Sequence, residues 1–105
     1  MAQQKNSFEE LYALVKSGGV YLVEDVHTSY WKGYGGGFRV SESFIEYSKN
    51  LIDQLNAFHS EEKEQFSVNQ FTKTTTSMHF YDSVVVFEKG EVSAPVNLED
   101  GKPVN

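Results

Sequence analysis

The feature that most constrains this chain is an apolar run that ends abruptly in acids, within the stretch GGVYLVEDVHTSYW (residues 18–31). Residues 20–26 are apolar at nearly every position until Glu24, which predicts a buried strand with both faces covered. The change from apolar to acidic residues predicts that the end of this strand reaches a solvent-facing edge. We expect a ligand to meet the protein there, because open α/β sheets bind ligands at strand ends.

Two S-x-x-E patterns predict where helices begin. Ser7 to Glu10 is a capping box, in which both side chains satisfy free backbone N–H groups, so a helix is expected to start there and to stop at Gly18-Gly19. Ser43 to Glu46 opens a second helix, whose apolar stripe predicts an end near His59. Residues 27–40 show no period and contain three consecutive glycines, which predicts a mobile loop at the end of the strand.

The second half of the chain predicts a β-hairpin. Residues 74–80 and 83–88 are rich in β-branched and aromatic residues, and the turn is expected around Tyr81-Asp82. The polar residues 60–65 are expected to be a solvated connection. Residues 66–71 fit either a short strand or a loop.

Length and composition limit the class of protein. The 105 residues suffice for one domain with a modest core, expected over residues 1–90 and followed by a loosely ordered tail over residues 91–105. The net charge of -6, from nine basic and fifteen acidic residues, argues against a nucleic-acid partner. The lack of cysteine favours a reducing compartment. Since neither a signal peptide nor a membrane-spanning stretch is evident, we expect a cytoplasmic protein without a membrane partner.

Glu24, Asp25 and His27 are candidates for a metal-assisted reaction. Neighbouring side chains of a regular strand point to opposite faces, but at a strand end, where the backbone turns, both carboxylates can reach one cation. Mg²⁺ and Ca²⁺ prefer such oxygen ligands, and a neutral imidazole beside the ion suits a general base that removes a hydroxyl proton. A plainer interpretation is that the acids form a solvated strand end and His27 caps the loop. The spacing alone leaves both interpretations open.

Aromatic residues gather in the glycine-rich loop: Tyr30, Trp31, Tyr34 and Phe38. They either close over an apolar or sugar-like ligand or lie on the core as a lid. Gly35-Gly36-Gly37 lacks both the G-x-G-x-x-G pattern and a Walker lysine, so no phosphate-binding loop is predicted. His59 and His79 are expected to be packed or edge histidines rather than ligands.

Three stretches of the chain resemble one enzyme family: LVKSGGVYLVEDVHTSYW, SFIEYSKNLIDQLNAFH and SMHFYDSVVVFEKG. They are similar to the C-terminal half of the class I S-adenosylmethionine-dependent O-methyltransferases related to the cephalosporin-hydroxylase and macrolide or rhamnosyl O-methyltransferase group. The resemblance covers roughly residues 8–90 in the order of the family, and its V-E-D-x-H-T-S-Y-W string is fairly specific.

The resemblance implies an α/β fold, a partial Rossmann-like methyltransferase fold of helix, strand, helix and C-terminal antiparallel hairpin. It implies that Glu24 and Asp25 bind a metal ion, that His27 is the base acting on the hydroxyl of a small acceptor molecule, and that Tyr30 and Trp31 lie beside that acceptor. The N-terminal cofactor-binding half of the family has no counterpart here. S-adenosylmethionine and Mg²⁺ are therefore cofactors by resemblance only, and we do not expect catalysis by this chain alone.

The lack of that half also predicts an exposed strand edge. Without a neighbour on one side, residues 20–26 present an unpaired apolar edge, which is a template for pairing with another chain. We therefore expect a homodimer or a higher assembly, through strands paired across a twofold axis or through exchanged elements. Two functions remain: a chain derived from a metal-assisted O-methyltransferase and incomplete by itself, or a non-catalytic oligomerising or partner-binding module.

Overall fold

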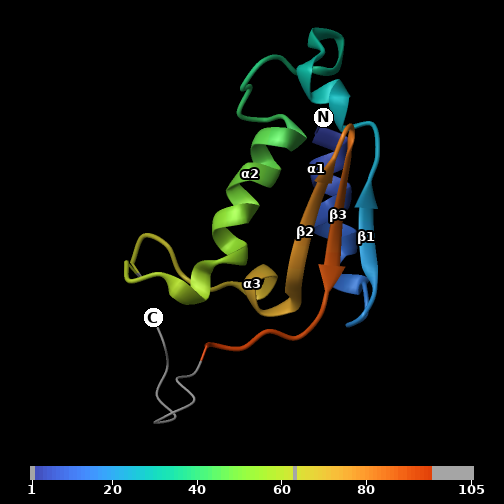
Figure 1. Cartoon of the computed structure of the whole chain (residues 1–105). Helices are drawn as coiled ribbons and strands as arrows, with labels where there is room; N and C mark the ends of the chain where they lie inside the picture. Colours follow the sequence, from blue (N-terminus) through green and yellow to red (C-terminus); the bar gives the residue numbers. More distant parts are fainter. Residues whose placement is uncertain (1, 63, 96–105) are drawn as a thin grey trace.

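The computed structural model describes residues 2–62 and 64–95 (Figure 1). Its helices and strands follow the order that the sequence predicts, with short 3₁₀ turns between them and one extra helix before the hairpin. The main elements are α1 (Ala2–Leu11), β1 (Val20–Val23), α2 (Phe44–Leu55), α3 (Gln70–Thr74), β2 (Thr75–Tyr81) and β3 (Val84–Lys89). The mixed α/β arrangement is therefore confirmed.

The three strands form one antiparallel sheet in the order β1-β3-β2. β2 and β3 make the predicted hairpin, in which Tyr81 pairs with Val84, so that the turn consists of Asp82 and Ser83. β3 also pairs with β1, and Leu22 lies opposite Val86. Within the described residues, β1 and β2 are consequently the two edge strands of the sheet.

One face of the sheet carries the hydrophobic core. Val85 and Phe87 of β3 are 2% and 0% exposed and point to the same face, because side chains of a strand alternate. The ring centre of Phe8 on α1 lies 4.6 Å from that of Phe87 and 6.3 Å from that of Phe44 on α2. Figure 1 shows α1 behind the strands and α2 beside them. Both helices thus cover this face and contact each other through aromatic side chains.

A buried lysine belongs to the same core. The Nζ atom of Lys89 donates a hydrogen bond to the carbonyl of Tyr12 at 2.8 Å and lies 4.1 Å from the centre of the Tyr12 ring. The hydroxyl of Tyr12 forms a hydrogen bond with Oγ1 of Thr75 at 2.7 Å. Burial lowers the pKa of Lys89 and raises the pKa of Tyr12. These contacts give partners to polar groups that would be costly to bury alone.

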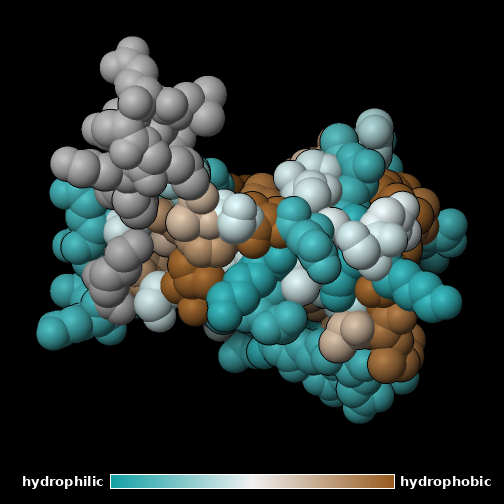
Figure 2. Space-filling model, turned by 90° about the horizontal axis from the view of Figure 1, so that it is seen from below, coloured by the Kyte–Doolittle hydropathy of each residue, from teal (hydrophilic) through white to brown (hydrophobic). Residues whose placement is uncertain are grey.

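The other face of the sheet is open in the described residues. Val20 and Leu22, whose side chains point away from the core, are 57% and 50% exposed. The expectation that both faces of this strand are covered is therefore wrong, because every second residue of β1 faces solvent. The strand also ends at Val23 rather than at Val26. Seen from below (Figure 2), hydrophobic patches interrupt a mostly hydrophilic surface.

Two predictions about helices are wrong. α1 extends from Ala2, so Ser7 and Glu10 lie inside the helix, where the preceding turn already satisfies the backbone N–H groups and a capping box has no role. Residues 66–69 form a loop, which is one of the two alternatives expected for residues 66–71, but Gln70 and Phe71 belong to the helix α3, which was not predicted. Asn69 caps this helix by accepting the N–H of Thr72 at 3.0 Å. Its own N–H donates in return to the Thr72 hydroxyl at 3.2 Å.

One of the two hydrogen bonds of the capping box predicted for α2 is formed. Oγ of Ser43 accepts the N–H of Glu46 at 3.2 Å, and α2 begins at Phe44, directly after Ser43. The carboxylate of Glu46 pairs instead with Nζ of Lys49 at 2.6 Å. α2 ends at Leu55, and a single 3₁₀ turn continues to His59, where the sequence predicts the end of the helix.

The predicted tail lies only partly within the described residues. Residues 91–95 form neither helix nor strand, but the N–H of Val92 donates to the carbonyl of Lys73 at 2.9 Å. Residues 96–105 lie outside the described part of the chain. Among the residues that are described, no helix has both the length and the apolar character needed to cross a membrane.

Candidate functional site

The chain turns sharply where β1 ends. Asp25 adopts a left-handed backbone conformation, with φ of 57°, which aspartate tolerates better than most residues. Residues Val26–Tyr30 then form a 3₁₀ turn, and the N–H of Thr28 donates to the carbonyl of Asp25 at 3.2 Å. The loop expected over residues 27–40 therefore starts with a hydrogen-bonded turn.

The side chains of Glu24 and Asp25 are exposed at this turn. The backbone beneath them is held by α1, because Nε2 of Gln4 donates to the carbonyl of Glu24 at 2.8 Å. Within residues 2–62 and 64–95, no group of three or more His, Cys, Asp or Glu side chains could hold a metal ion. Mg²⁺ is commonly held by one or two carboxylates with water at its other positions. The two acids supply oxygen ligands of the kind that Mg²⁺ takes, and their role as its ligands stays a prediction.

His27 is held by the turn of the hairpin. Its Nδ1 atom lies 2.5 Å from Oγ of Ser83, and its ring packs edge-on against Trp31, with 4.8 Å between the ring centres. The carbonyl of Ser83 also accepts the N–H of Val26 at 3.0 Å. Ser83 therefore positions both the backbone and the imidazole. Because Nδ1 is engaged, Nε2 is the ring nitrogen left to accept a proton or a ligand.

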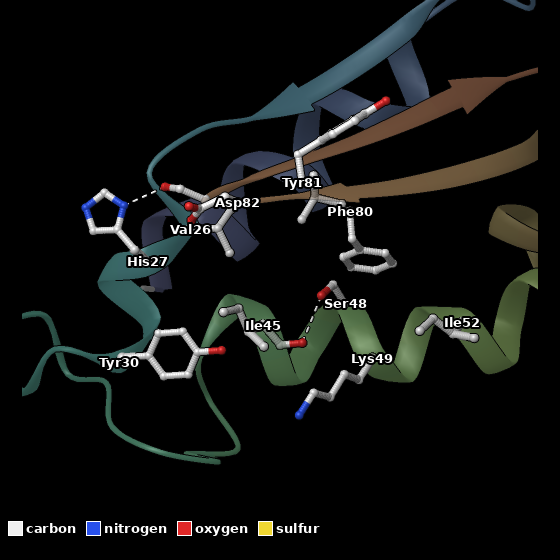
Figure 3. Close-up of a pocket in the computed structure, with 12 residues that line it drawn as sticks. Val26, His27, Tyr30, Ile45, Ser48, Lys49, Ile52, Phe80, Tyr81 and Asp82 are labelled. Carbon is white, nitrogen blue, oxygen red and sulfur yellow. Dashed lines mark hydrogen bonds between the residues drawn. The ribbon is translucent and has the colours of Figure 1, made fainter.

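A cavity of about 390 Å³ opens beside His27, between α2 and the hairpin (Figure 3). Apolar side chains form much of its wall: Val26, Ile45, Ile52, Phe80 and Val85. Polar side chains also line it: His27, Tyr30, Ser48, Lys49, Asp82 and Ser83. Figure 3 shows that Phe80 points toward α2, whereas Tyr81 points away from it. Apolar cavities with a few polar groups are the usual form of small-molecule sites.

The structure brings some of the predicted site residues to this cavity and leaves others outside it. His27 and Tyr30 line the cavity, whereas Glu24, Asp25 and Trp31 do not. Trp31 reaches the site indirectly, through its contact with the ring of His27. The metal, catalytic and substrate roles of these five residues stay predictions.

The contribution of the hairpin to the cavity was missed from the sequence. Asp82 and Ser83 reach the cavity from the turn between β2 and β3. Their local sequence indicates only a turn, and the contact of Ser83 with His27 joins positions 56 residues apart. Lys49 reaches the cavity from α2, where its pairing with Glu46 three residues earlier is typical of any helix surface.

The triple glycine packs the loop onto itself. A Cβ atom on Gly36 would overlap the carbonyl oxygen of Ser29, so a larger residue does not fit there unless the backbone shifts. The N–H of Gly37 donates to the same carbonyl at 2.8 Å, and Oγ of Ser29 accepts the N–H of Ile45 at 3.2 Å. Gly36 therefore allows the backbone of the loop to pack closely against itself at Ser29.

The four aromatic side chains of the loop do not form a lid packed on the core. Each is at least half exposed: Tyr30 51%, Trp31 51%, Tyr34 56% and Phe38 78%. Exposed aromatic rings beside an apolar cavity are suited to contact with a ligand. Of these four residues Tyr30 alone lines the cavity beside His27, so contact of the loop aromatics with a ligand stays a prediction.

His79 belongs to a polar cluster on the open face of the sheet, away from the cavity. Its Nε2 atom lies 2.6 Å from Oε2 of Glu88 and 3.0 Å from Oγ of Ser77. Hydrogen bonds from Ser77 and then from His79 hold the pKa of Glu88 below its usual range. His59 is exposed at the end of the 3₁₀ turn that follows α2. Neither histidine lines the cavity beside His27.

Known proteins match this chain at the level of sequence, although no protein-family model matches it. Demethylmacrocin O-methyltransferase of Streptomyces fradiae is 31% identical over 102 residues, which cover 94% of this chain. Mycinamicin VI 2''-O-methyltransferase of Micromonospora griseorubida is 30% identical over 105 residues, which cover 97% of this chain. The chain spans only about 25% of the length of these curated relatives.

Solved structures match the fold as well. The MycE methyltransferase from the mycinamycin biosynthetic pathway, in complex with Mg and SAH, matches 83% of this chain with 30% identity and a TM-score of 0.75. The match spans 23% of the MycE chain. A second MycE structure, in complex with Mg, SAH and mycinamycin VI, matches 96% of this chain with the same TM-score and 27% identity.

The fold and the strand-end turn thus define a partial α/β domain of the methyltransferase type. Within that class, the chain is related to one region of the macrolide and rhamnosyl O-methyltransferases, and it has the fold of that region. The family resemblance seen in the sequence is confirmed.

Proposed function

We propose that this chain forms the acceptor-binding part of a metal-assisted O-methyltransferase that acts on a hydroxyl group of a small, sugar-like molecule. The observation that carries the proposal is the position of His27, held by Ser83 beside a largely apolar cavity. The relatives support it, since their names describe O-methyltransferases of macrolide and rhamnosyl compounds. They do not favour the alternative of a non-catalytic module. A cytoplasmic location stays a prediction from the lack of cysteine.

In this proposal His27 is the general base. When Nδ1 donates its proton to Oγ of Ser83, the lone pair of Nε2 is free to accept the proton of the acceptor hydroxyl. Loss of that proton makes the oxygen a better nucleophile for the methyl group. Tyr30 and the apolar wall around Phe80 would pack against the acceptor, and Trp31 would keep the imidazole in place from outside the cavity.

Glu24 and Asp25 would hold Mg²⁺ in the same proposal. Both carboxylates are exposed at the turn that leads directly into His27. A divalent cation stabilises negative charge on an acceptor oxygen, which is the chemistry that the metal would supply. Because the described residues do not provide a third ligand of this type near them, the remaining positions would be filled by water, by the acceptor or by other polypeptide.

S-adenosylmethionine does not fit the described residues. β1 is followed by two acids rather than by a glycine-rich turn into a helix, and the space beside Gly36 is filled by the backbone of the loop. The proposal therefore assigns the acceptor and the metal to this chain, and the methyl donor to polypeptide beyond the described residues. We expect the chain alone to transfer no methyl group.

The metal site can be tested with Mn²⁺, a paramagnetic substitute for Mg²⁺. On addition of Mn²⁺ to the ¹⁵N-labelled chain, the strongest broadening of amide signals is expected at residues 24–27. The double variant Glu24→Gln/Asp25→Asn should lose it. The matched variant Glu61→Gln/Glu62→Gln, which removes an exposed acidic pair elsewhere, should retain it. Equal loss in both variants would show that Mn²⁺ responds only to net charge.

The acceptor site can be tested separately, with methyl α-L-rhamnoside as the probe. Binding should shift the NMR signals of His27, Tyr30 and Ser83, which line the cavity. The variant Phe80→Ala removes part of the apolar wall and should weaken the binding, whereas Phe38→Ala, in an exposed part of the loop, should not. Shifts that are absent, or that occur away from the cavity, would contradict the acceptor site.

A further inference from the structure

A side-chain amide of α1 contacts the backbone of both acidic residues at the end of β1. Nε2 of Gln4 donates to the carbonyl of Glu24 at 2.8 Å and makes a longer contact, of 3.4 Å, with the carbonyl of Asp25. The carboxylates of these two residues are the ones proposed to hold Mg²⁺. A residue about 20 positions away in the sequence thus holds the backbone of both proposed ligands.

The packing of α1 on the sheet places Gln4 at this turn. Gln4 and Phe8 are four residues apart, so they lie on the same side of the helix. The ring centre of Phe8 lies 4.6 Å from that of Phe87 on β3 and 5.3 Å from that of Tyr21 on β1. Figure 1 shows that α1 begins at the end of the sheet where β1 ends. The hydrophobic core therefore fixes the position from which the amide reaches the turn.

The backbone that Gln4 contacts is in a costly conformation. Asp25 has φ of 57° and ψ of 36°, and a left-handed residue of this kind persists where surrounding contacts maintain it. The N–H and the hydroxyl of Thr28 donate to the carbonyl of Asp25 at 3.2 Å and 3.0 Å. Because a carbonyl oxygen has two lone pairs, the main contribution of Gln4 is its shorter bond, to Glu24. Gln4 and Thr28 therefore hold the turn from its two ends.

The amide of Gln4 is poorly suited to a role in global stability. Its Oε1 atom is buried and has no hydrogen-bond partner within residues 2–62 and 64–95. A buried acceptor without a partner costs at least as much free energy as one hydrogen bond contributes. The side chain as a whole should therefore add little to the free energy of unfolding. Its amide does define a direction, since the reverse orientation would place Oε1 against two carbonyl oxygens.

We infer that Gln4 is a positioning residue for the proposed metal site, because it fixes the turn from which the carboxylates of Glu24 and Asp25 extend. The inference rests on the proposed function. Side chains of a regular strand alternate between its faces, so neighbouring carboxylates reach one cation where the backbone turns. Loss of the amide would release the carbonyl of Glu24, and the two carboxylates would then take up more directions relative to each other.

The variant Gln4→Leu tests the inference with Mn²⁺ as the probe. Leucine removes the amide and is a good helix former, so α1 should be retained. The apparent dissociation constant for Mn²⁺, measured from the broadening of the amide signals of residues 24–27, should rise about tenfold, as for other residues that orient metal ligands. Gln3→Leu is the matched control, because Gln3 is the neighbouring glutamine of α1 and is exposed. It should bind Mn²⁺ like the wild-type chain.

Two measurements on the metal-free chain separate positioning from stability. The urea midpoint of Gln4→Leu should stay close to that of the wild-type chain. The residual dipolar couplings of the amides of residues 24–27 should change in Gln4→Leu and should be retained in Gln3→Leu. An affinity for Mn²⁺ that Gln4→Leu leaves unchanged, or that falls equally in both variants, would overturn the inference.

Failure of the metal site itself would give a different pattern. If Mn²⁺ does not broaden the signals of residues 24–27 in the wild-type chain, the proposed metal role of Glu24 and Asp25 is contradicted, whatever the variants do. The dipolar couplings of the metal-free chain then judge Gln4 by themselves. Couplings that change at residues 24–27 in Gln4→Leu would support its hold on the turn, and unchanged couplings would overturn it.

Discussion

Two substitutions of Ser83 separate the effect of its hydroxyl group from the effect of its left-handed backbone conformation. Ser83→Ala removes the hydroxyl that lies 2.5 Å from Nδ1 of His27 and keeps the left-handed backbone, with φ of 66°. Loss of one partly buried hydrogen bond costs about 1 kcal/mol. Ser83→Gly loses the same bond but relieves a left-handed conformation that costs a non-glycine residue about 1 kcal/mol. We therefore expect the alanine variant to be destabilised and the glycine variant to be close to wild type.

Urea unfolding and NMR together check this prediction. With a urea m-value of about 2 kcal/mol/M, the midpoint of Ser83→Ala should fall by about 0.5 M. The long-range ¹H–¹⁵N spectrum reports which imidazole nitrogen carries the proton. The wild-type chain should show the proton of His27 on Nδ1, and both variants should lose this preference. His59, which is exposed, serves as an internal control in the same spectrum.

Two results would refute the reasoning. If the alanine and glycine variants were equally destabilised, the backbone conformation of Ser83 would not matter to stability. If the proton of His27 stayed on Nδ1 in both variants, the hydroxyl would not set the tautomer, and Ser83 would not position the proposed base. Because both measurements use the isolated chain, neither requires methyl transfer.

Three further predictions concern stability. Phe87→Ala removes a fully buried ring and should cost about 3–5 kcal/mol in the free energy of unfolding, measured by urea titration. Burial, and then the charge of Glu9, raises the pKa of Tyr47 above its usual 10.0. The stability contributed by the neutral hydroxyl of Tyr47 is therefore complete below pH 10 and is lost as the pH rises further. In the variant Tyr47→Phe, the free energy of unfolding should depend less on pH between pH 9 and about 11. Gly36→Ala forces a Cβ atom against the loop backbone and should cost about 1–3 kcal/mol; thermal unfolding should show no comparable loss for Gly33→Ala, which meets nothing within 4 Å.

The sequence predicts those elements whose signals are local. The hairpin follows from two β-branched runs that flank a short turn, and α2 follows from Ser43, which caps it as expected. The S-x-x-E pattern at Ser7 fails because a helix can pass through such a pattern when its residues continue to fit. The helix capped by Asn69 was missed because its capping box uses threonine as the second residue.

The candidate site is less predictable because tertiary contacts build it. Glu24, Asp25 and His27 share the end of one strand, so their proximity follows from the sequence. The roles of Ser83 and of the cavity wall depend on how the hairpin lies against α2, and periodicity does not report that arrangement. The expectation of a strand covered on both faces failed for a similar reason, since an apolar run does not tell which neighbours are present.

The site depends on two turns that meet, and each turn contains a non-glycine residue in the left-handed conformation. Asp25 redirects the chain after β1, and Ser83 redirects it between β2 and β3. Such conformations are costly unless the surrounding structure holds them in place. Here the pairing of β1 with β3 brings the two turns together, and the bond from Val26 N–H to the Ser83 carbonyl joins them. It follows that the orientation of His27 depends on the sheet as well as on Trp31 of its own loop, so a change that weakens the pairing of β1 with β3 should disturb the proposed base even when α2 stays intact.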